Sequence, residues 1–375
     1  MKIQFIDLRR QYQAYKAEID TQINDVITSS AFIMGSKVAE LEQQLREFVG
    51  TKYALGCSSG TDALLLALMA YDIQPGDEII TTPFSFIATS EAIALLKAKP
   101  VFVDIDEQTF NIDPARIPHA VTGKTRGIIA VDIFGQCAEY DEINQAARTN
   151  NLFVIEDGAQ SFGAQYKKHQ ACSLADIGCT SFFPAKPLGC YGDGGAIFTN
   201  DENIYKIARS FRVHGKGENK YDNVRVGLNA RLDTIQAAVL LAKLKHYSEE
   251  IKMRGTAAAC YSSQLDQDVK VPEILPHNLS VFAQYCILAE NRDGLQQHLK
   301  ERDIPTAIHY PKPLHLQPAF SGLGYKEGDF PVSEKICQNI LALPMHPFML
   351  EEEQHFIVES IKSFYKEEAH VLRKP

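Results

Sequence analysis

The amino-acid sequence predicts an α/β protein: a large domain built on a mainly parallel sheet of about seven strands, followed by a smaller α+β domain. Between about residues 50 and 200, short apolar β-rich runs alternate with helical patterns, as they do in strand–helix–strand units. The length of 375 residues exceeds one ordinary compact domain. After about residue 250, helical patterns mix with β-rich pieces such as residues 281–288, which predicts the second domain.

Seven apolar runs account for the predicted sheet. They begin at Tyr53, Ile79, Pro100, Gly127, Leu152, Gly178 and Gly195. Turn signals separate several of them, among them Pro75-Gly76-Asp77 and Asp193-Gly194-Gly195. Because helical patterns stand between many of these runs, we expect a mainly parallel sheet.

A long polar loop is predicted at residues 213–230, which are rich in glycine and asparagine and follow neither a helical nor a strand period. Loops of this length are often functional. A helix should follow, with Asp233 near its start and Ile235, Val239 and Ala242 on one face. We expect the large domain to span residues 1–248, including an N-terminal helical segment, and the small domain to span residues 249–375.

Composition excludes several classes of protein. No apolar run approaches the roughly 20 residues of a membrane span, and the N-terminus lacks the pattern of a secretory signal, so the expected location is the cytoplasm. The net charge is 38 minus 47, or −9, without a basic stripe for nucleic acid. The eight cysteines show no close pairing, so we expect mostly buried, reduced thiols and no metal site.

Lys186 is the first candidate functional residue. An apolar strand leads to it, and it stands between Pro184-Ala185 and Pro187-Leu188, ahead of a glycine-rich hairpin. A lysine in a rigid, partly dry turn can have a lowered pKa, so that its amine can act as a nucleophile and form an imine. The alternative is a solvated loop lysine, the ordinary state of this residue type.

Acidic side chains at the end of a predicted strand form the second candidate element. The run at residues 152–155 ends in Glu156-Asp157-Gly158, and the carboxyl ends of strands face the ligand cleft of α/β sheets. Because neighbouring side chains on a strand point to opposite faces, we choose Asp157 for the cleft and expect Glu156 on the other face. The alternative is an acidic turn or helix cap.

A small-residue turn directly before an apolar helix, at residues 57–65, is the third element. Free backbone N–H groups, hydroxyls and the positive end of the helix dipole would meet there, which makes it a candidate anion site. The alternative is a simple N-cap. Residues 192–195 match neither a P-loop nor a dinucleotide fingerprint.

Together the three elements offer a nucleophilic amine, a carboxylate and a phosphate cradle on one sheet. Pyridoxal phosphate needs all three, because a carboxylate against its ring nitrogen keeps the ring protonated as an electron sink. The chain closely resembles the sugar aminotransferases of the DegT/DnrJ/EryC1/StrS family, which are fold-type-I pyridoxal-phosphate enzymes. The resemblance covers nearly the whole chain and is carried by ordered motifs: Gly35, Glu42, residues 60–64, residues 156–161, residues 181–186, residues 227–231, residues 309–311 and residues 343–347.

The resemblance implies a set of cofactor-binding residues: Gly60, Thr61, Phe86, Asp157, Gln160, Ser181, Lys186 and Asn229. Gly60, Thr61 and Ser181 should hold the phosphate. Asp157 should hold the ring nitrogen and Gln160 the ring hydroxyl, while Phe86 should stack on the ring unless it is an ordinary core phenylalanine. In the family, the residue at Asn229 reaches the phosphate of the neighbouring subunit, which implies a homodimer with shared active sites.

Substrate-binding residues are implied as well. Arg231 is similar to the family's carboxylate-binding arginine from the partner subunit, and a planar guanidinium suits a carboxylate. A surface ion pair is the alternative. His309 and Tyr310 match positions near the bound sugar nucleotide, although a purely structural role fits these residue types nearly as well.

The expected reaction is a two-step transamination, in which L-glutamate leaves as 2-oxoglutarate and a nucleotide-linked keto-sugar then takes the amino group, with Lys186 as imine partner and proton carrier. Residues 134–138, 179–191 and 231–238 look most like the bacterial O-antigen enzymes that make a 2,3-diamino-uronic acid. The expected substrate is therefore UDP-2-acetamido-2-deoxy-3-oxo-D-glucuronate, aminated at C3. The alternative is C4 amination of a UDP-, GDP- or dTDP-4-keto-6-deoxy sugar.

Three other classes fit the sequence less well. Family members that act as dehydratases carry histidine at the position of Lys186. A regulatory or scaffold protein would not need every expected catalytic position to be kept. A dehydrogenase would need the missing dinucleotide fingerprint.

Overall fold

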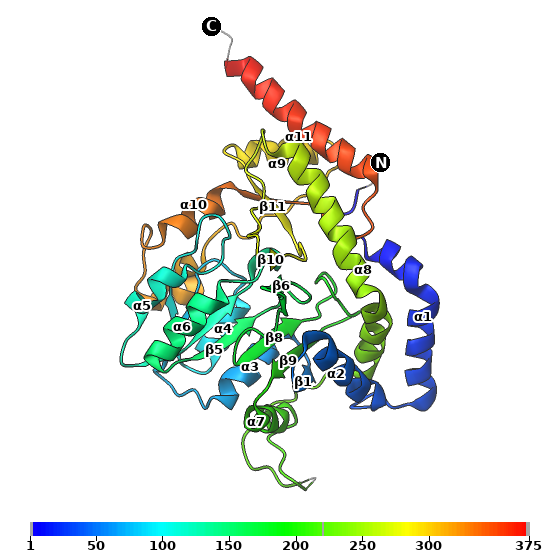
Figure 1. Ribbon diagram of the computed structural model, residues 1–375, viewed down its shortest axis with the longest axis vertical. Helices are drawn as coiled ribbons and strands as arrows, with labels where there is room; N and C mark the ends of the chain where they lie inside the picture. The colour runs from blue at the N-terminus through cyan, green and yellow to red at the C-terminus, as the bar shows by residue number, and fades with distance from the viewer. Residues whose placement is uncertain (1–2, 220, 373–375) are drawn as a thin grey trace.

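A computed structural model describes residues 3–219 and 221–372. Within these residues, the largest sheet has seven strands in the order β1-β9-β8-β5-β4-β2-β3 (Figure 1). The strands are β1 (Tyr53–Cys57), β2 (Glu78–Thr81), β3 (Lys99–Phe102), β4 (Thr125–Val131), β5 (Phe153–Asp157), β8 (Ile177–Ser181) and β9 (Gly195–Thr199). Each begins within two residues of its predicted start.

The large sheet is mainly parallel, as predicted. Strands β3, β2, β4, β5 and β8 pair in parallel, whereas β9 runs antiparallel to both β8 and β1. Strand β1 therefore points the same way as β8, and the carboxyl ends of six strands meet at one edge. The structure confirms the predicted α/β fold class.

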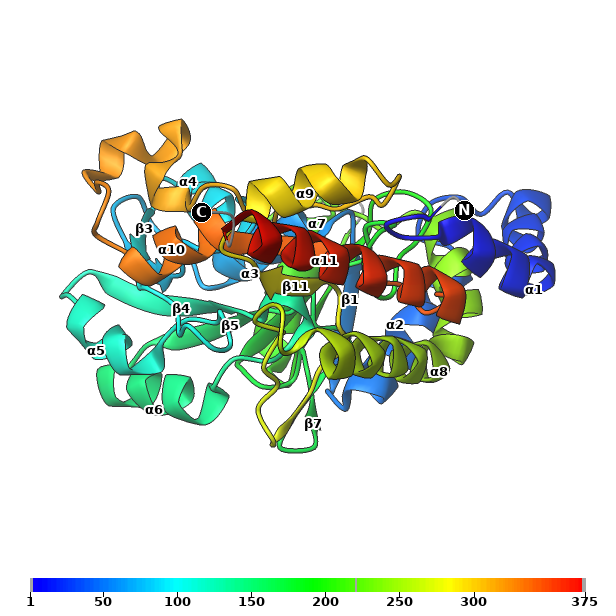
Figure 2. The ribbon, with the colours of Figure 1, turned by 90° about the horizontal axis from the view of Figure 1, so that it is seen from above.

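Along each central strand, successive side chains point to opposite faces of the sheet and pack into two different hydrophobic cores. In β2, Ile79 packs toward α3 (Gly60–Ala70), α4 (Ala88–Leu95) and α7 (Glu202–Arg212), whereas Ile80 packs toward the face of α6 (Tyr140–Asn150). In β4, Ile129 packs in the same core as Ile79, and Ile128 packs in the same core as Ile80. Helices α5 (Ile117–Ala120) and α6 thus lie on the opposite side of the sheet from α3, α4 and α7 (Figure 2). A sheet covered on both faces buries its strands completely.

A smaller unit follows the sheet. It contains the antiparallel pair β11 (Tyr285–Leu288) and β12 (Ile340–Leu343), with α9 (Arg292–Lys300), α10 (Pro331–Asn339) and α11 (Glu351–Leu372). A second small sheet joins β10 (Asn278–Leu279), β6 (Gln165–Tyr166) and β7 (His169–Gln170). The strand expected within residues 281–288 is present. In the described residues, no helix has the length and apolarity to cross a membrane.

The long helix α8 (Thr234–Leu265) joins the two regions, and Asp233, expected near its start, directly precedes it. Its first half packs in one core with α2 (Ser36–Val49), and its last turns pack in another core with β11, α9 and α11. Helix α1 (Leu8–Ser29) lies along α8 (Figure 1). The boundary expected between residues 248 and 249 falls inside α8, so the division at that residue stays a prediction.

The acidic run at residues 351–353 begins α11, and its members differ in burial. Glu351 and Glu352 are exposed. Glu353 is buried instead, because the guanidinium of Arg10 donates to both of its carboxylate oxygens at 2.7 Å. A buried carboxylate that receives such a paired donor is well compensated. All eight cysteines are free thiols, and seven of them are buried, as predicted.

Candidate active site

The carboxyl edge of the large sheet brings together the three elements that the sequence singled out. Gly195 of β9 pairs with Cys57 on one side and with Ser181 on the other, and Asp157 of β5 pairs with Cys179 of β8. The turns that follow β1, β5 and β8 therefore lie next to each other. Residues 58–61, 157–160 and 181–186 share this edge.

The turn after β1 has the features of an anion site. Ser59 caps α3, because its hydroxyl accepts a hydrogen bond from the amide of Asp62 at 3.0 Å. Within the described part of the chain, the amides of Gly60 and Thr61 have no hydrogen-bond partner. A Cβ atom on Gly60 would lie 2.7 Å from the Cβ atom of Ser181, so only glycine lets this turn approach Ser181 so closely. Two free amides thus stand at the positive end of an 11-residue helix.

Asp157 presents a buried carboxylate at the same edge. One of its oxygens accepts a hydrogen bond from the Thr89 hydroxyl at 2.7 Å, and the other accepts from the Ala159 amide at 3.2 Å. Burial raises the pKa of Asp157, while these hydrogen bonds and the charge of Lys186 act in the opposite direction. No sequence pattern singled out Thr89 beyond its place three residues after Phe86.

Glu156 points to the other face of β5, as predicted. Its carboxylate accepts hydrogen bonds from the amides of Leu174, at 2.9 Å, and Cys172. Burial, followed by the neighbouring Asp132, raises its pKa well above the ordinary value. Glu156 is therefore part of a buried network behind the sheet and not part of the candidate site.

Lys186 stands in a tight turn that starts directly after β8. Its amide donates to the carbonyl of Phe183 at 2.8 Å, and the amide of Cys190 closes the turn on the carbonyl of Phe182 at 2.8 Å. Burial lowers the pKa of Lys186, and the charge of Asp157 partly offsets this effect. The residue is half-buried and not a freely solvated loop lysine, and its charge interacts with the predicted ring-nitrogen acid.

Gln160, Tyr310, His309 and Phe86 lie around this pair. The Gln160 side chain accepts from the Phe134 amide at 3.0 Å and donates to the Tyr310 hydroxyl at 3.4 Å. Burial and then the charge of Lys186 lower the pKa of His309, so His309 also faces the lysine. The ring of Phe86 lies 6.5 Å from that of Tyr310 and is 57% exposed, which excludes an ordinary core phenylalanine.

Asn229 and Arg231 lie at the β1 end of the edge, on the strand-like end of the long loop. Asn229 bridges to Val213 and Arg231 bridges to Cys57 through backbone atoms. Asn229 is exposed and Arg231 is half-buried. In residues 3–219 and 221–372, the Arg231 guanidinium has no ion pair or hydrogen bond. A surface ion pair within the described residues therefore does not account for Arg231.

The residues of this edge fit pyridoxal phosphate. The free amides of Gly60 and Thr61 suit a phosphate. Asp157 is a buried carboxylate whose raised pKa would fall beside a cationic ring nitrogen. The exposed side chain of Phe86 offers an aromatic surface beside Tyr310, which hydrogen-bonds Gln160.

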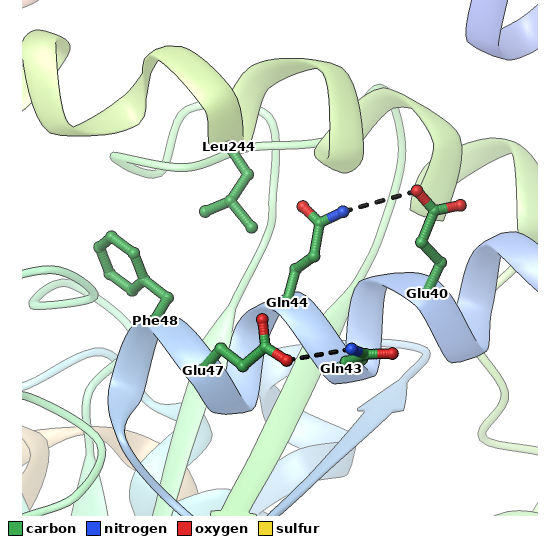
Figure 3. A pocket seen from close by; sticks show the side chains of 6 residues that line it. All are labelled: Glu40, Gln43, Gln44, Glu47, Phe48 and Leu244. Atoms are coloured by element: carbon green, nitrogen blue, oxygen red, sulfur yellow. Dashed lines mark hydrogen bonds between the residues drawn. The ribbon is translucent and has the colours of Figure 1, made fainter.

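A separate hollow of about 490 Å³ lies between α2 and α8 and includes none of the predicted site residues. Figure 3 shows its lining: Glu40, Gln43, Gln44, Glu47, Phe48 and Leu244. Gln43 donates to Glu47 at 3.0 Å and Gln44 donates to Glu40 at 3.5 Å, so its polar groups largely satisfy one another. We assign no function to this surface groove.

Comparisons with known proteins identify the family of the chain. The model of the DegT/DnrJ/EryC1/StrS aminotransferase family matches residues 13–362. A UDP-2-acetamido-2-deoxy-3-oxo-D-glucuronate aminotransferase of Pseudomonas aeruginosa is 48% identical over 92% of this chain and 96% of its own length. A pleiotropic regulatory protein of Geobacillus stearothermophilus is 45% identical over 98% and 99%.

A solved structure has the same fold. The DegT/DnrJ/EryC1/StrS aminotransferase from Brucella abortus superposes with a TM-score of 0.93 at 44% identity, over 97% of this chain and 99% of that one. Other solved relatives hold the cofactor in its pyridoxamine or pyridoxal form. The chain therefore belongs to the DegT/DnrJ/EryC1/StrS aminotransferase family and is a pyridoxal-phosphate-dependent aminotransferase that acts on nucleotide-linked sugars.

Proposed function

We propose that the protein transfers the amino group of L-glutamate to C3 of UDP-2-acetamido-2-deoxy-3-oxo-D-glucuronate, in the synthesis of a bacterial O-antigen. The observation that carries the chemistry is that Lys186 and Asp157 interact electrostatically at the sheet edge that also holds the free amides of Gly60 and Thr61. The substrate proposal rests on the name of the Pseudomonas aeruginosa relative at 48% identity.

Each residue of the edge takes one part in holding the cofactor. Gly60, Thr61 and Ser181 hold the phosphate, since the two amides have no partner within the described residues and Ser181 adjoins them. Asp157 holds the protonated ring nitrogen, and Gln160 holds the ring hydroxyl. When bound, the cofactor supplies the electron sink that makes a carbon–hydrogen bond next to nitrogen acidic.

Lys186 moves the proton. Because burial lowers the pKa of its amine, a larger share of Lys186 is neutral near pH 7 than in an ordinary lysine. A neutral amine can take a proton from the carbon of the amino donor and deliver one to C3 of the sugar. His309, whose pKa is also lowered, stays neutral beside it and does not compete as a cation. We assign His309 and Tyr310 to the sugar side of the cleft.

We further propose a homodimer that shares its active sites. Asn229 is exposed and Arg231 has no partner within the described residues. Apolar side chains are exposed nearby: Phe32 and Ile33, next to the start of α8, and Val224 and Val226 in the loop at residues 213–230. Exposed apolar groups of this kind mark interaction surfaces. A second copy would cover them and bring Asn229 and Arg231 to the neighbour's Lys186.

Arg231 fits a uronate substrate as well as glutamate. Glutamate and the uronic acid each carry a carboxylate, and they occupy the site in turn, so one guanidinium can serve both. A 4-keto-6-deoxy sugar would place a methyl group there instead. An arginine alone does not select between these substrates, and the relative's name favours the uronate.

The test offers both keto-sugars at equal concentration with glutamate and follows the aminated products by mass. We expect the 3-oxo-glucuronate to be converted at least about tenfold faster than the 6-deoxy sugar, because its carboxylate can pair with a cationic side chain in the pocket. Preference for the 6-deoxy sugar would overturn the uronate and leave the aminotransferase unchanged.

A further inference from the structure

Lys243 is an unusual buried lysine that the chemistry above does not use. It lies in the first half of α8, is 1% exposed, and has buried helix neighbours such as Leu240 and Tyr247. No carboxylate of the described residues lies within ion-pair distance of its amine. Charged lysines are almost never fully buried without a partner, so another group is expected to compensate the burial of this amine.

The amine of Lys243 contacts the segment that follows Lys186. Its Nζ donates to the carbonyl of Gly189 at 2.7 Å and lies 4.3 Å from the ring centroid of Tyr191. Gly189 belongs to the turn whose tip is Lys186, three residues earlier in the chain. A Cβ atom on Gly189 would lie 2.4 Å from the carbonyl oxygen of Pro184, so the two legs of this turn are in close contact.

A second side chain of α8 contacts the same segment. Gln236 accepts from the amide of Tyr191 at 2.8 Å and donates to its carbonyl at 3.4 Å. Gln236 and Lys243 are seven residues apart, which is about two turns, so they share one face of the helix. Helix α8 thus binds the returning leg of the turn at Gly189 and at Tyr191.

The charged groups around Lys243 are few. Burial lowers its pKa to about 8, while Glu250 of the same helix and the Cys190 thiol of the turn act in the opposite direction. Glu250 itself receives two hydrogen bonds from Gln11 of α1. The Tyr191 ring completes the surroundings. The Gly189 carbonyl is therefore the direct hydrogen-bond partner of the lysine in the described chain.

We propose that Lys243 is a positioning residue, which holds the Gly189 carbonyl and thereby fixes the turn that presents Lys186. The inference rests on the role of Lys186 in the proposed function. A hydrogen bond from a buried amine is strong and directional, and small displacements of a reacting group lower turnover steeply. Loosening the turn would also let water reach Lys186, whose low pKa depends on burial.

The test compares Lys243→Met with the matched control Lys245→Met, an exposed lysine of the same helix that pairs with Glu18 at 3.4 Å. In cofactor-free protein, the pH profile of Lys186 labelling by an amine reagent is measured by peptide mass. In loaded protein, kcat and the KM for glutamate are measured. For Lys243→Met we expect the labelling midpoint to rise by at least about half a pH unit. We expect kcat to fall about tenfold while the KM changes less than about threefold.

Gln236→Met removes the other contact between α8 and this segment, at Tyr191, and should shift the labelling midpoint in the same direction. It therefore still tests the inference if Lys243→Met fails to fold. Lys243→Arg, which keeps a cationic donor, should recover part of kcat. An unchanged midpoint and kcat in both Lys243→Met and Gln236→Met would overturn the inference, as would an equal effect of Lys245→Met. If wild-type protein binds no cofactor through Lys186, the proposed function fails instead, and peptide mass after borohydride reduction distinguishes that result.

Discussion

Two parts of the candidate site differ in whether their polar groups find partners within this chain. At the carboxyl edge of the sheet, Asp157 is buried and both of its oxygens accept hydrogen bonds. On the loop at residues 213–230 and just after it, Asn229 is exposed, Val226 is 91% exposed, and Arg231 has no partner within the described residues. The first part is assembled by one subunit, whereas the second presents its groups outward.

This difference separates two tasks. The groups expected to meet the cofactor lie on strand ends and a helix start, where packing on both faces of the sheet fixes them. The groups expected to meet the substrate or the neighbour's cofactor lie on or beside a long loop, where they can reach across an interface. Changes at the edge should therefore act within one subunit, and changes around the loop should act between subunits.

The largest effect is expected at Lys186. Lys186→Ala should reduce turnover by on the order of 10⁴-fold, because it removes the amine that forms the cofactor link and moves the proton. The fold should remain, since the contacts expected for the phosphate and the ring come from other residues. Steady-state kinetics and thermal unfolding measure the two effects. Undiminished turnover would refute the mechanism.

A smaller loss is expected for Asp157→Asn. An amide cannot stabilise a protonated ring nitrogen as a carboxylate does, so kcat should fall by about 10² to 10³-fold. Asp141→Asn is a matched control, since Asp141 is an exposed carboxylate that pairs with Lys167 at 2.5 Å. Equal kinetics for the two variants would show that Asp157 does not serve the ring.

Mixing subunits tests the part near the loop. Lys186→Ala and Arg231→Ala should each be inactive as pure dimers. The first variant lacks the amine that moves the proton, and the second leaves a buried substrate carboxylate without its charged partner, which costs about 3–5 kcal/mol. At equal mixing half of the dimers are heterodimers, and one of their two sites is intact, so about a quarter of full activity should return. If subunits demonstrably exchange and no activity returns, the shared site is wrong.

Local patterns predicted much of this architecture. The seven strands begin within two residues of their expected positions, because alternation of the kind seen at Ile79 and Ile80 depends only on neighbouring residues. The division of Glu156 from Asp157 follows from the same period. Lys186, Asp157 and the turn at residues 58–61 could be brought together because parallel strand ends share an edge.

Pairings between distant segments could not be predicted in this way. Glu353 is buried only because Arg10, 343 residues earlier, supplies its guanidinium. Arg212 is buried because it donates to Glu42 at 2.6 Å and to the carbonyl of Gly56 at 2.7 Å. Lys243 reads as a solvated helical lysine until the turn at Gly189 is packed against it. No local period encodes such contacts, since they depend on how elements are brought together in space.

The smallest effect is expected at Val226, which tests whether the exposed loop is part of a subunit interface. Val226→Asp places a charge where we expect a second copy to cover an apolar side chain. Burial of a valine side chain contributes about 1.5 kcal/mol, and the two-fold symmetry of a dimer introduces the change twice. The dimer dissociation constant should rise at least about tenfold, while activity at high protein concentration stays near that of the unchanged protein, because no expected site residue is altered. Sedimentation velocity over a dilution series measures the constant. Leu95→Asp is the control, since Leu95 on α4 is 61% exposed and lies outside the proposed interface. Equal dissociation constants for Val226→Asp and Leu95→Asp would place the interface elsewhere, and the exposed loop would then need another partner.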